Sequence, residues 1–206
     1  MKKFIIIIAS LLFAVSAHAQ FGVIAGITSS RSDIKSAIAD VQGKNITQYH
    51  VGITYKFGGN VFAVQPALLY NVKGTALDIT DISSTKLDMK TGFIELPVQL
   101  QLGIGLGDIA RIYGFAEPFI GYAVSNSGTF NGTAVKDLKW ENIKNRLEYG
   151  VGVGLGVELI KHVQVSVKYF WNMGNLYNGD ISFAGVTKTI ADSKANGIAA
   201  SVALLF

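Results

Sequence analysis

Two glutamates, Glu95 and Glu117, are the residues of this chain that most resemble an acid/base pair able to exchange protons with a substrate. Both lie in alternating apolar and polar segments, and register across the turn at Gly105 puts them diagonally close, with a register error of about two residues. Adjacent carboxylates supply the acid and base of many hydrolases. No nucleophile or metal motif accompanies this pair, so we interpret it as structural, with Lys168 or Arg146 supplying the cation; an acid/base pair is the alternative.

His50 is the one candidate base, because His18 precedes a predicted cleavage site and His162 falls in a short turn. The chain has no cysteine, which excludes disulfides, thiolate metal sites and cysteine nucleophiles. The glycine-rich segments lack phosphate-loop spacing, and no zinc or calcium signature is present. We therefore expect no catalytic residue, no metal and no cofactor.

The first residues predict an export signal. Lys2 and Lys3 precede a short apolar stretch, and small residues follow near Ala19. We expect residues 1–19 to be a signal peptide and residues 20–206 to be one domain, with an N-terminal membrane anchor as the alternative. Removing the two lysines lowers the formal charge from +4 to +2. The remaining charges are mixed in sign along the chain, so no nucleic-acid partner is expected.

Period-two alternation then recurs eight times between clusters of Gly, Asn, Asp and Ser. The predicted strands are 20–28, 48–57, 61–71, 91–104, 110–123, 146–159, 163–173 and 196–206. Short and long connections alternate between them, as in an up-and-down antiparallel sheet. An even number of strands lets such a sheet close and removes its free edges. The predicted fold is all-β, an eight-stranded antiparallel up-and-down barrel.

The stretch RLEYGVGVGLGVEL, residues 146–159, indicates which face of this barrel is apolar. Aliphatic residues and Tyr149 alternate with glycine and charge. Glycine suits the outside of a soluble barrel poorly, but a narrow interior needs small residues. The pattern therefore predicts a transmembrane β-barrel with lipid outside and few large side chains inside. A soluble carrier barrel with the opposite faces is the alternative.

Aromatic residues at the outward-facing positions of the predicted strands lie at two levels along the barrel axis, as expected for the two interfaces of a membrane. The ring near the long loops comprises Tyr49, Tyr70, Tyr122, Tyr149, Tyr169 and Trp171, and the ring near the short turns comprises Phe21, Phe57, Phe62 and Phe206. Outer-membrane lipid is thus an expected partner.

Charged residues on the inward phase predict an ion-pair network that plugs the lumen. Its expected members are Arg111, Glu158, Glu95, Glu117, Lys168, Arg146 and Glu148. Register places Arg111 opposite Glu158 near the short-turn end. Buried charges destabilise a fold unless they are paired, so these residues are expected to neutralise one another.

Several short motifs resemble the PorT-like family of small outer-membrane barrels of the Bacteroidota, with an architecture akin to OmpX- and OmpA-type barrels. They are FIELPV at residues 93–98, EPFIGY at 117–122, residues 152–159, and VKYFWNMG at 167–174. The terminal Phe206 resembles the aromatic that the barrel assembly machinery recognises. The resemblance implies the outer membrane of a Gram-negative bacterium and no defined activity.

The expected function is therefore that of a small non-enzymatic outer-membrane barrel whose four long extracellular loops act in envelope structure or surface recognition of an unknown partner. Those loops contain Trp140 and the stretches 79–82 and 181–186, which could extend strands beyond the membrane or present an edge to a partner. Stabilisation of the loops themselves is the alternative. The alternatives are a narrow pore for transport and, at the outer rim near His50, an enzyme that modifies membrane lipid.

Overall fold

A computed structural model describes residues 19–34, 43–79, 85–107, 109–130, 133–135, 146–174, 179–183, 186–190 and 193–206. Eight long strands dominate it. They are β1 (Gln20–Ile34), β2 (Gly43–Gly58), β3 (Phe62–Ile79), β4 (Thr85–Leu106), β5 (Ala110–Phe130), β7 (Leu147–Leu159), β8 (Val163–Asn172) and β11 (Ser193–Leu205).

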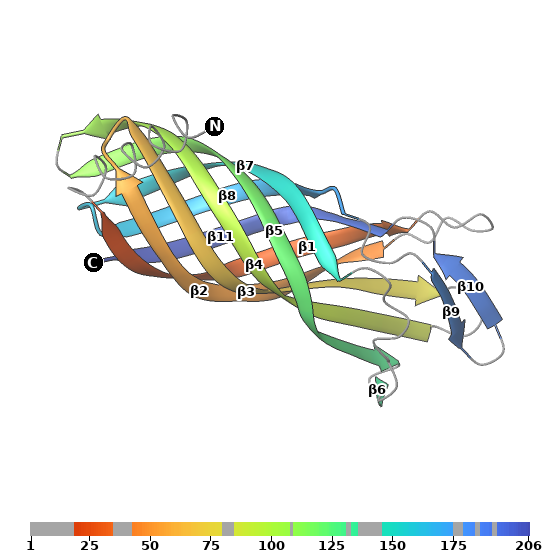
Figure 1. The fold of residues 1–206 in the computed structure, drawn as a ribbon. Helices are drawn as coiled ribbons and strands as arrows, with labels where there is room; N and C mark the ends of the chain where they lie inside the picture. The colour runs from red at the N-terminus through yellow and green to blue at the C-terminus, as the bar shows by residue number, and fades with distance from the viewer. Residues whose placement is uncertain are drawn as a thin grey trace, which may run out of the picture.

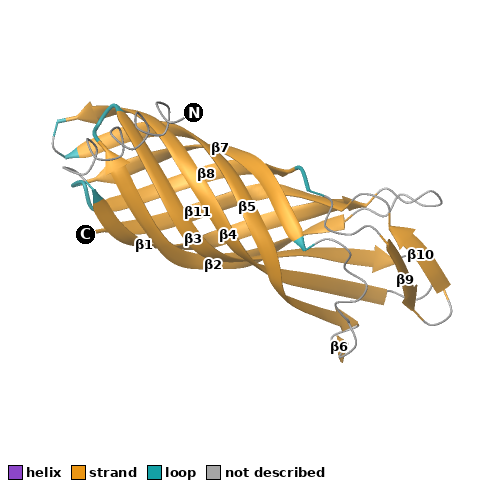
Figure 2. Cartoon of the chain, in the orientation of Figure 1, coloured by secondary structure: helices purple, strands orange, loops and turns teal. Residues whose placement is uncertain are grey.

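These strands form a closed barrel (Figure 1). Each pairs antiparallel with its neighbour in the sequence, and the β1–β11 ladder joins the first strand to the last. The closed ladder leaves no free edge around the barrel wall. Figure 2 shows strands throughout, and no described segment is helical. In keeping with this, no helix among the described residues has the length and apolarity to cross a membrane. The predicted fold class is confirmed.

The two ends of the barrel differ. At one, which we call the turn end, short connections join β2 to β3, β4 to β5 and β7 to β8. Ile160 and Lys161 turn the chain with φ of 51° and 61°, as expected for the left-handed residues of a tight hairpin. The start of β1 and the end of β11 meet here, and the Phe206 amide donates a hydrogen bond to the carbonyl of Phe21 at 2.7 Å. The opposite end is the loop end.

The strands reach further at the loop end than the alternation predicts. The third strand continues from residue 71 to Ile79, the fourth starts at Thr85 instead of 91, and the fifth continues to Phe130. Three short strands lie within the segments predicted as long loops: β6 (Thr133–Val135), β9 (Gly179–Phe183) and β10 (Val186–Ile190). Trp140 and residues 1–18 of the predicted signal lie outside the described residues.

The two faces of the wall have the predicted polarity. Along β8, exposed residues alternate with buried ones, and Val165, Val167 and Tyr169 are among those on the outside. Where side chains are described, the only exposed Asp, Glu, Lys or Arg are Lys90 and Lys161, one near each end of the barrel. A wall that is apolar between its ends is suited to hydrocarbon outside, not to water.

Candidate functional site in the barrel lumen

The lumen holds equal numbers of buried acids and bases. Where the structure describes side chains, the buried cations are Lys56, Lys73, Arg111 and Lys168, and the buried anions are Glu95, Glu117, Glu148 and Glu158. Isolated charges in such surroundings would be costly, and this balance permits each of them to be paired. The eight residues form three clusters along the barrel axis.

At the turn end, Glu158 is the centre of the first cluster. Lys56 Nζ lies 2.7 Å from Oε1 and 2.6 Å from Oε2 of this carboxylate, and Gln164 donates to Oε2 at 2.8 Å. Arg111 pairs with Glu158 in the β5–β7 ladder, the register expected from the sequence, and its Nη1 lies 3.6 Å from Oε2. The closer cation, Lys56, is not among the predicted network members.

In the middle of the barrel, Glu117 forms an ion pair with Lys168 and accepts a hydrogen bond from Gln99 at 2.7 Å. Glu95 is not part of this cluster. In the β4–β5 ladder it lies opposite Gly121, four positions along β5 from Glu117, and its carboxylate forms an ion pair with a different lysine, Lys73. The structure therefore does not bring Glu95 and Glu117 together around one cation, because the register separates them further than the sequence arithmetic suggested.

Toward the loop end, Lys73 joins two carboxylates. Its Nζ lies 3.0 Å from Glu95 and 2.9 Å from Glu148. Three rings surround the same ammonium, with centroids at 4.7 Å for Phe119, 5.1 Å for Phe170 and 5.5 Å for Phe93. A cation above aromatic faces gains further electrostatic stabilisation. We call this group the Lys73 cluster.

Sequence reasoning missed Lys73 because it ended the third strand at residue 71. The signal was available, since Lys73 continues the inward phase of Leu69 and Asn71 at a spacing of two. Arg146, which was also expected in the network, lies half-buried just before β7 and has an interaction partner there.

His50 is buried within the barrel wall, not exposed at a rim. Its Nδ1 lies 2.9 Å from Thr28 Oγ1 and its Nε2 lies 2.9 Å from Ser201 Oγ. Thr28 also donates to Asn71, whose amide donates to Glu95 at 3.0 Å. This chain of hydrogen bonds satisfies a buried imidazole and links it to the Lys73 cluster.

Large aromatic side chains fill much of the remaining interior, contrary to the expectation that few would fit. Phe93, Tyr113, Phe115, Phe119 and Phe170 are all buried. Three of those on β5 pair directly with glycines of β7: Tyr113 with Gly156, Phe115 with Gly154 and Phe119 with Gly150. Each ring occupies the space that a Cβ on its partner would need. The glycines of the alternating stretch therefore make room for rings on the neighbouring strand.

The packed lumen leaves little free space. One cavity lies among Gln65, Gln99, Glu117, Lys168 and Ser201, and it has room for about one water molecule. A second cavity of similar size lies beside Arg111 at the turn end. In the described part of the chain, no group of three or more His, Asp or Glu residues is placed to hold a metal. Neither cavity admits a substrate or a hydrated solute.

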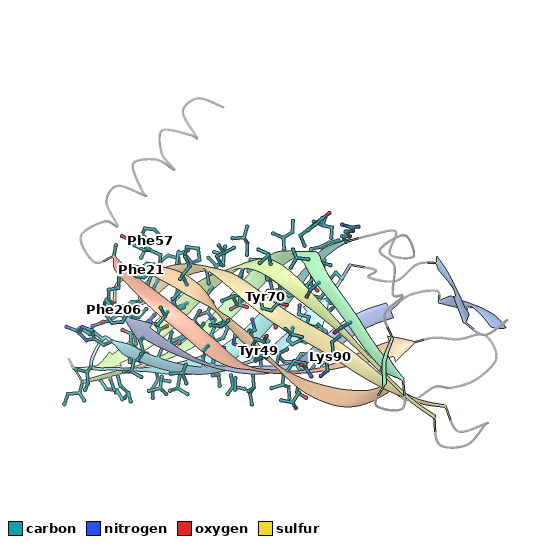
Figure 3. All side chains as sticks on the ribbon, turned by 90° about the horizontal axis from the view of Figure 1, so that it is seen from below. Phe21, Tyr49, Phe57, Tyr70, Lys90 and Phe206 are labelled. Carbon is teal, nitrogen blue, oxygen red and sulfur yellow. The ribbon has the colours of Figure 1, made fainter. Side chains whose placement is uncertain are left out.

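The aromatic residues predicted for two rings occupy both heights of the outer wall. Figure 3 places Phe21, Phe57 and Phe206 together at the turn end, with Tyr49 and Tyr70 further toward the loop end. Eight of the ten predicted aromatics are exposed, while Tyr70 and Phe57 are half-buried. Tyr55, which the prediction omits, is also exposed and packs 4.6 Å from the Phe57 ring centroid.

Comparisons with known proteins agree with this architecture. The sequence model of a family described as outer membrane protein beta-barrel domain matches residues 13–178, which is more than half of the chain. No curated protein matches in sequence.

Solved structures of similar fold cover 91% of this chain. Neisserial surface protein A (NspA) is 14% identical with a TM-score of 0.46 over 99% of its own chain. Ail, the attachment invasion locus protein of Yersinia pestis, solved with the heparin analogue sucrose octasulfate, is 12% identical with a TM-score of 0.42 over 99%. OprG from Pseudomonas aeruginosa is 14% identical with a TM-score of 0.41 over 96%.

Proposed function

Because the chain belongs to the outer membrane protein beta-barrel domain family, we propose that it is a non-enzymatic barrel of a Gram-negative outer membrane that presents a recognition surface outside the cell. The observation that carries this proposal is the extension of β3, β4 and β5 past the aromatic residues at the loop end, above a lumen that is already filled. The barrel is then an anchor, and the extended sheet is the part that meets other molecules.

A sealed lumen favours an anchor over a pore. Paired charges span the interior from the turn end to the loop end: Arg111 with Glu158, Glu117 with Lys168, and the Lys73 cluster. The cavities described above are of the size of one water molecule. Eight strands enclose an interior only wide enough for side chains. The network is therefore proposed to act structurally, by filling and stiffening the barrel.

The extended sheet supports a role in recognition. Beyond the barrel it continues through β3, β4 and β5 to the short strand β6, which is the last strand of this sheet among the residues that the structure describes. A strand at a sheet edge offers unpaired backbone groups to which an extended peptide can add. An extracellular protein segment is thus a suitable class of partner.

Three finer assignments belong to the same proposal. The motifs at 93–98 and 117–122 support membership of the PorT-like group of Bacteroidota barrels. The basic and apolar start of the chain supports export by a signal peptide of residues 1–19. The exposed aromatic at Phe206, at the end of the last strand, supports recognition by the barrel assembly machinery.

The enzymatic alternative has less support. A lipid-modifying enzyme needs an accessible base and nucleophile at the rim, whereas His50 is only 3% exposed and both of its ring nitrogens are engaged by hydroxyl groups.

Cysteine labelling tests the proposed location and orientation. The chain has no cysteine, so Lys90→Cys at the loop end and Lys161→Cys at the turn end are single reporters at exposed positions. We expect a polyethylene-glycol maleimide too large to pass porins to label Lys90→Cys on intact cells. Lys161→Cys should react only after the outer membrane is permeabilised. Equal labelling of both variants on intact cells, or the reverse pattern, would contradict the orientation.

Planar-bilayer recording tests the sealed lumen. Purified protein is expected to give no discrete current steps, because ion pairs and rings occupy the path through the barrel. Protein denatured before addition is the control for leakage caused by damaged bilayers. Reproducible openings of one size from the folded protein would favour the pore and overturn the sealed anchor.

A further inference from the structure

One buried nitrogen of the lumen has no hydrogen-bond partner among the residues that the structure describes. It is Nη2 of Arg111, a residue that is only 2% exposed. The other two nitrogens of this guanidinium are engaged, because Nε donates to the carbonyl of Asn60 at 2.7 Å and Nη1 donates to Gln101 at 2.8 Å. Buried donors are nearly always satisfied, and a charged donor is costly to leave alone. Nη2 therefore needs an acceptor that the described side chains do not supply.

The charges around Arg111 are also unequal. At the turn end, where side chains are described, Lys56 and Arg111 are two buried cations and Glu158 is the one buried anion. Both oxygens of that carboxylate already bind Lys56, and Oε2 also accepts from Gln164. The Lys73 cluster at the loop end has the opposite excess, one cation with two carboxylates. An anion at the turn end would offset the local positive charge.

A cavity beside Arg111 has room for such an ion. It lies at the turn end, where Figure 1 marks the C-terminus, and it holds about one water molecule. Its lining consists of Asn60, Gly107, Ala110, Arg111, Glu158 and Lys161. The amide of Asn60 and the ammonium of Lys161 add two further donor groups, and both residues are exposed. The cavity is thus next to solvent and is lined mainly by donors and small residues.

Two glycines of β4 keep this place open. A Cβ on Gly103 would lie 2.6 Å from Nε and 3.0 Å from Cζ of Arg111, and a Cβ on Gly105 would lie 3.2 Å from Nδ2 of Asn60. Residues from all three short connections line the cavity, since one each comes from the β2–β3, β4–β5 and β7–β8 turns. An ion held there would join the three turns.

We propose that this cavity is a binding site for one small inorganic anion of the size of chloride, held by Nη2 of Arg111 with Lys161 and Asn60 beside it. A charged donor bonds an anion more strongly than it bonds neutral water, which favours the ion over a trapped water molecule. Chloride without its hydration shell is little larger than water, whereas phosphate and carboxylate groups are too large for the cavity. The site stabilises the turn end and is independent of what the loop end recognises.

Two neighbours compete with the ion for Nη2. The ring centroid of Tyr113 lies 5.0 Å from Cζ of Arg111, and an aromatic face is a weaker acceptor than an anion. Asp108 follows Gly107 in the sequence, and its side chain lies outside the described residues. A test of the site must therefore distinguish an ion from water, from this ring and from this carboxylate.

Bromide, which scatters X-rays anomalously, identifies the occupant directly. Crystals of the purified barrel grown in sodium bromide are expected to show an anomalous peak within hydrogen-bond distance of Nη2 of Arg111. A water molecule without anomalous signal overturns the proposal. An Nη2 group turned onto the ring of Tyr113, or a carboxylate of Asp108 in the cavity, overturns it as well.

Chloride NMR line broadening measures the same site in solution and separates it from binding at crystal concentration only. The folded barrel is expected to broaden the chloride signal, and bromide should remove the excess width. Arg111→Lys keeps the charge but loses the second N–H group, so it is expected to weaken chloride binding at least about tenfold, as for the loss of a hydrogen bond to a charged group. Heat-dependent gel mobility reports the folded barrel for each variant.

A pair of surface variants keeps the test decisive if Arg111→Lys does not fold. Lys161→Gln removes a charge beside the cavity and should weaken chloride binding severalfold. Lys90→Gln removes the same charge at the loop end and should leave the binding unchanged. Equal binding by these two variants overturns the proposal. Chloride that binds only after Asp108→Asn also overturns it, because Nη2 then belongs to that carboxylate in the parent chain.

Discussion

Replacing Lys73 with methionine is expected to lower the free energy of unfolding by about 3–5 kcal/mol, the usual cost of removing one partner from a buried ion pair. Lys73 Nζ contacts both Glu95 and Glu148 within 3.0 Å, and the residue is only 4% exposed. Without it, two carboxylates face one another among the rings of Phe93, Phe119 and Phe170. Urea unfolding in lipid vesicles, followed by the fluorescence of the two tryptophans, measures the loss.

A charge-neutral variant separates charge from packing. Lys73→Met combined with Glu95→Gln and Glu148→Gln removes the cation and both anions, while keeping amide groups that can hydrogen bond. This triple variant is expected to recover most of the lost stability, because buried ion pairs can often be replaced by neutral side chains at small cost. If the triple variant is as unstable as Lys73→Met alone, the shape of the lysine matters and its charge does not.

The strand pattern was readable from the sequence as far as the membrane extends. Within the barrel one face of each strand meets lipid and the other meets the packed lumen, so exposed and buried residues alternate regularly, as along β8. Before residue 91 the period-two signal in the sequence changes phase, since Lys86, Asp88 and Lys90 take the even positions that apolar residues hold from Ile94 onward. The predicted strands therefore ended where the surroundings change, although the backbone ladder continues to Thr85.

The sequence predicted which residues lie in the lumen better than it predicted which of them form ion pairs with one another. Alternation alone assigns Arg111, Glu117 and Glu158 to the interior, and all three are buried there. Which cation meets which carboxylate depends on strand stagger across the barrel, since Lys56 on β2 reaches Glu158 on β7. Neighbour register between consecutive strands contains no information about contacts across the lumen, so this pairing and the contacts of Lys73 with two glutamates emerged only from the closed barrel.

Replacing Gly154 with alanine is expected to destabilise the barrel by about 1–3 kcal/mol, the typical cost of overpacking a filled core. An added Cβ at Gly154 would lie 2.5 Å from Cζ of Phe115 and would also meet the carbonyl oxygen of Val167. The ring has little freedom to move, because the lumen around it is packed. The matched control is Gly152→Ala, two residues away on the same face, where the added atom would lie 3.4 Å or more from its neighbours.

Gly152→Ala is expected to be neutral or to stabilise the fold by about 0.4–1 kcal/mol through lower entropy of the unfolded chain. Adding Phe115→Leu to Gly154→Ala should recover part of the loss by removing the ring but not the backbone contact with Val167. Urea midpoints of the four proteins, with the parent chain as reference, measure both effects. Equal midpoints for the two alanine variants would mean that the alternating glycines serve only to keep the wall thin, and that the rings of β5 do not require them.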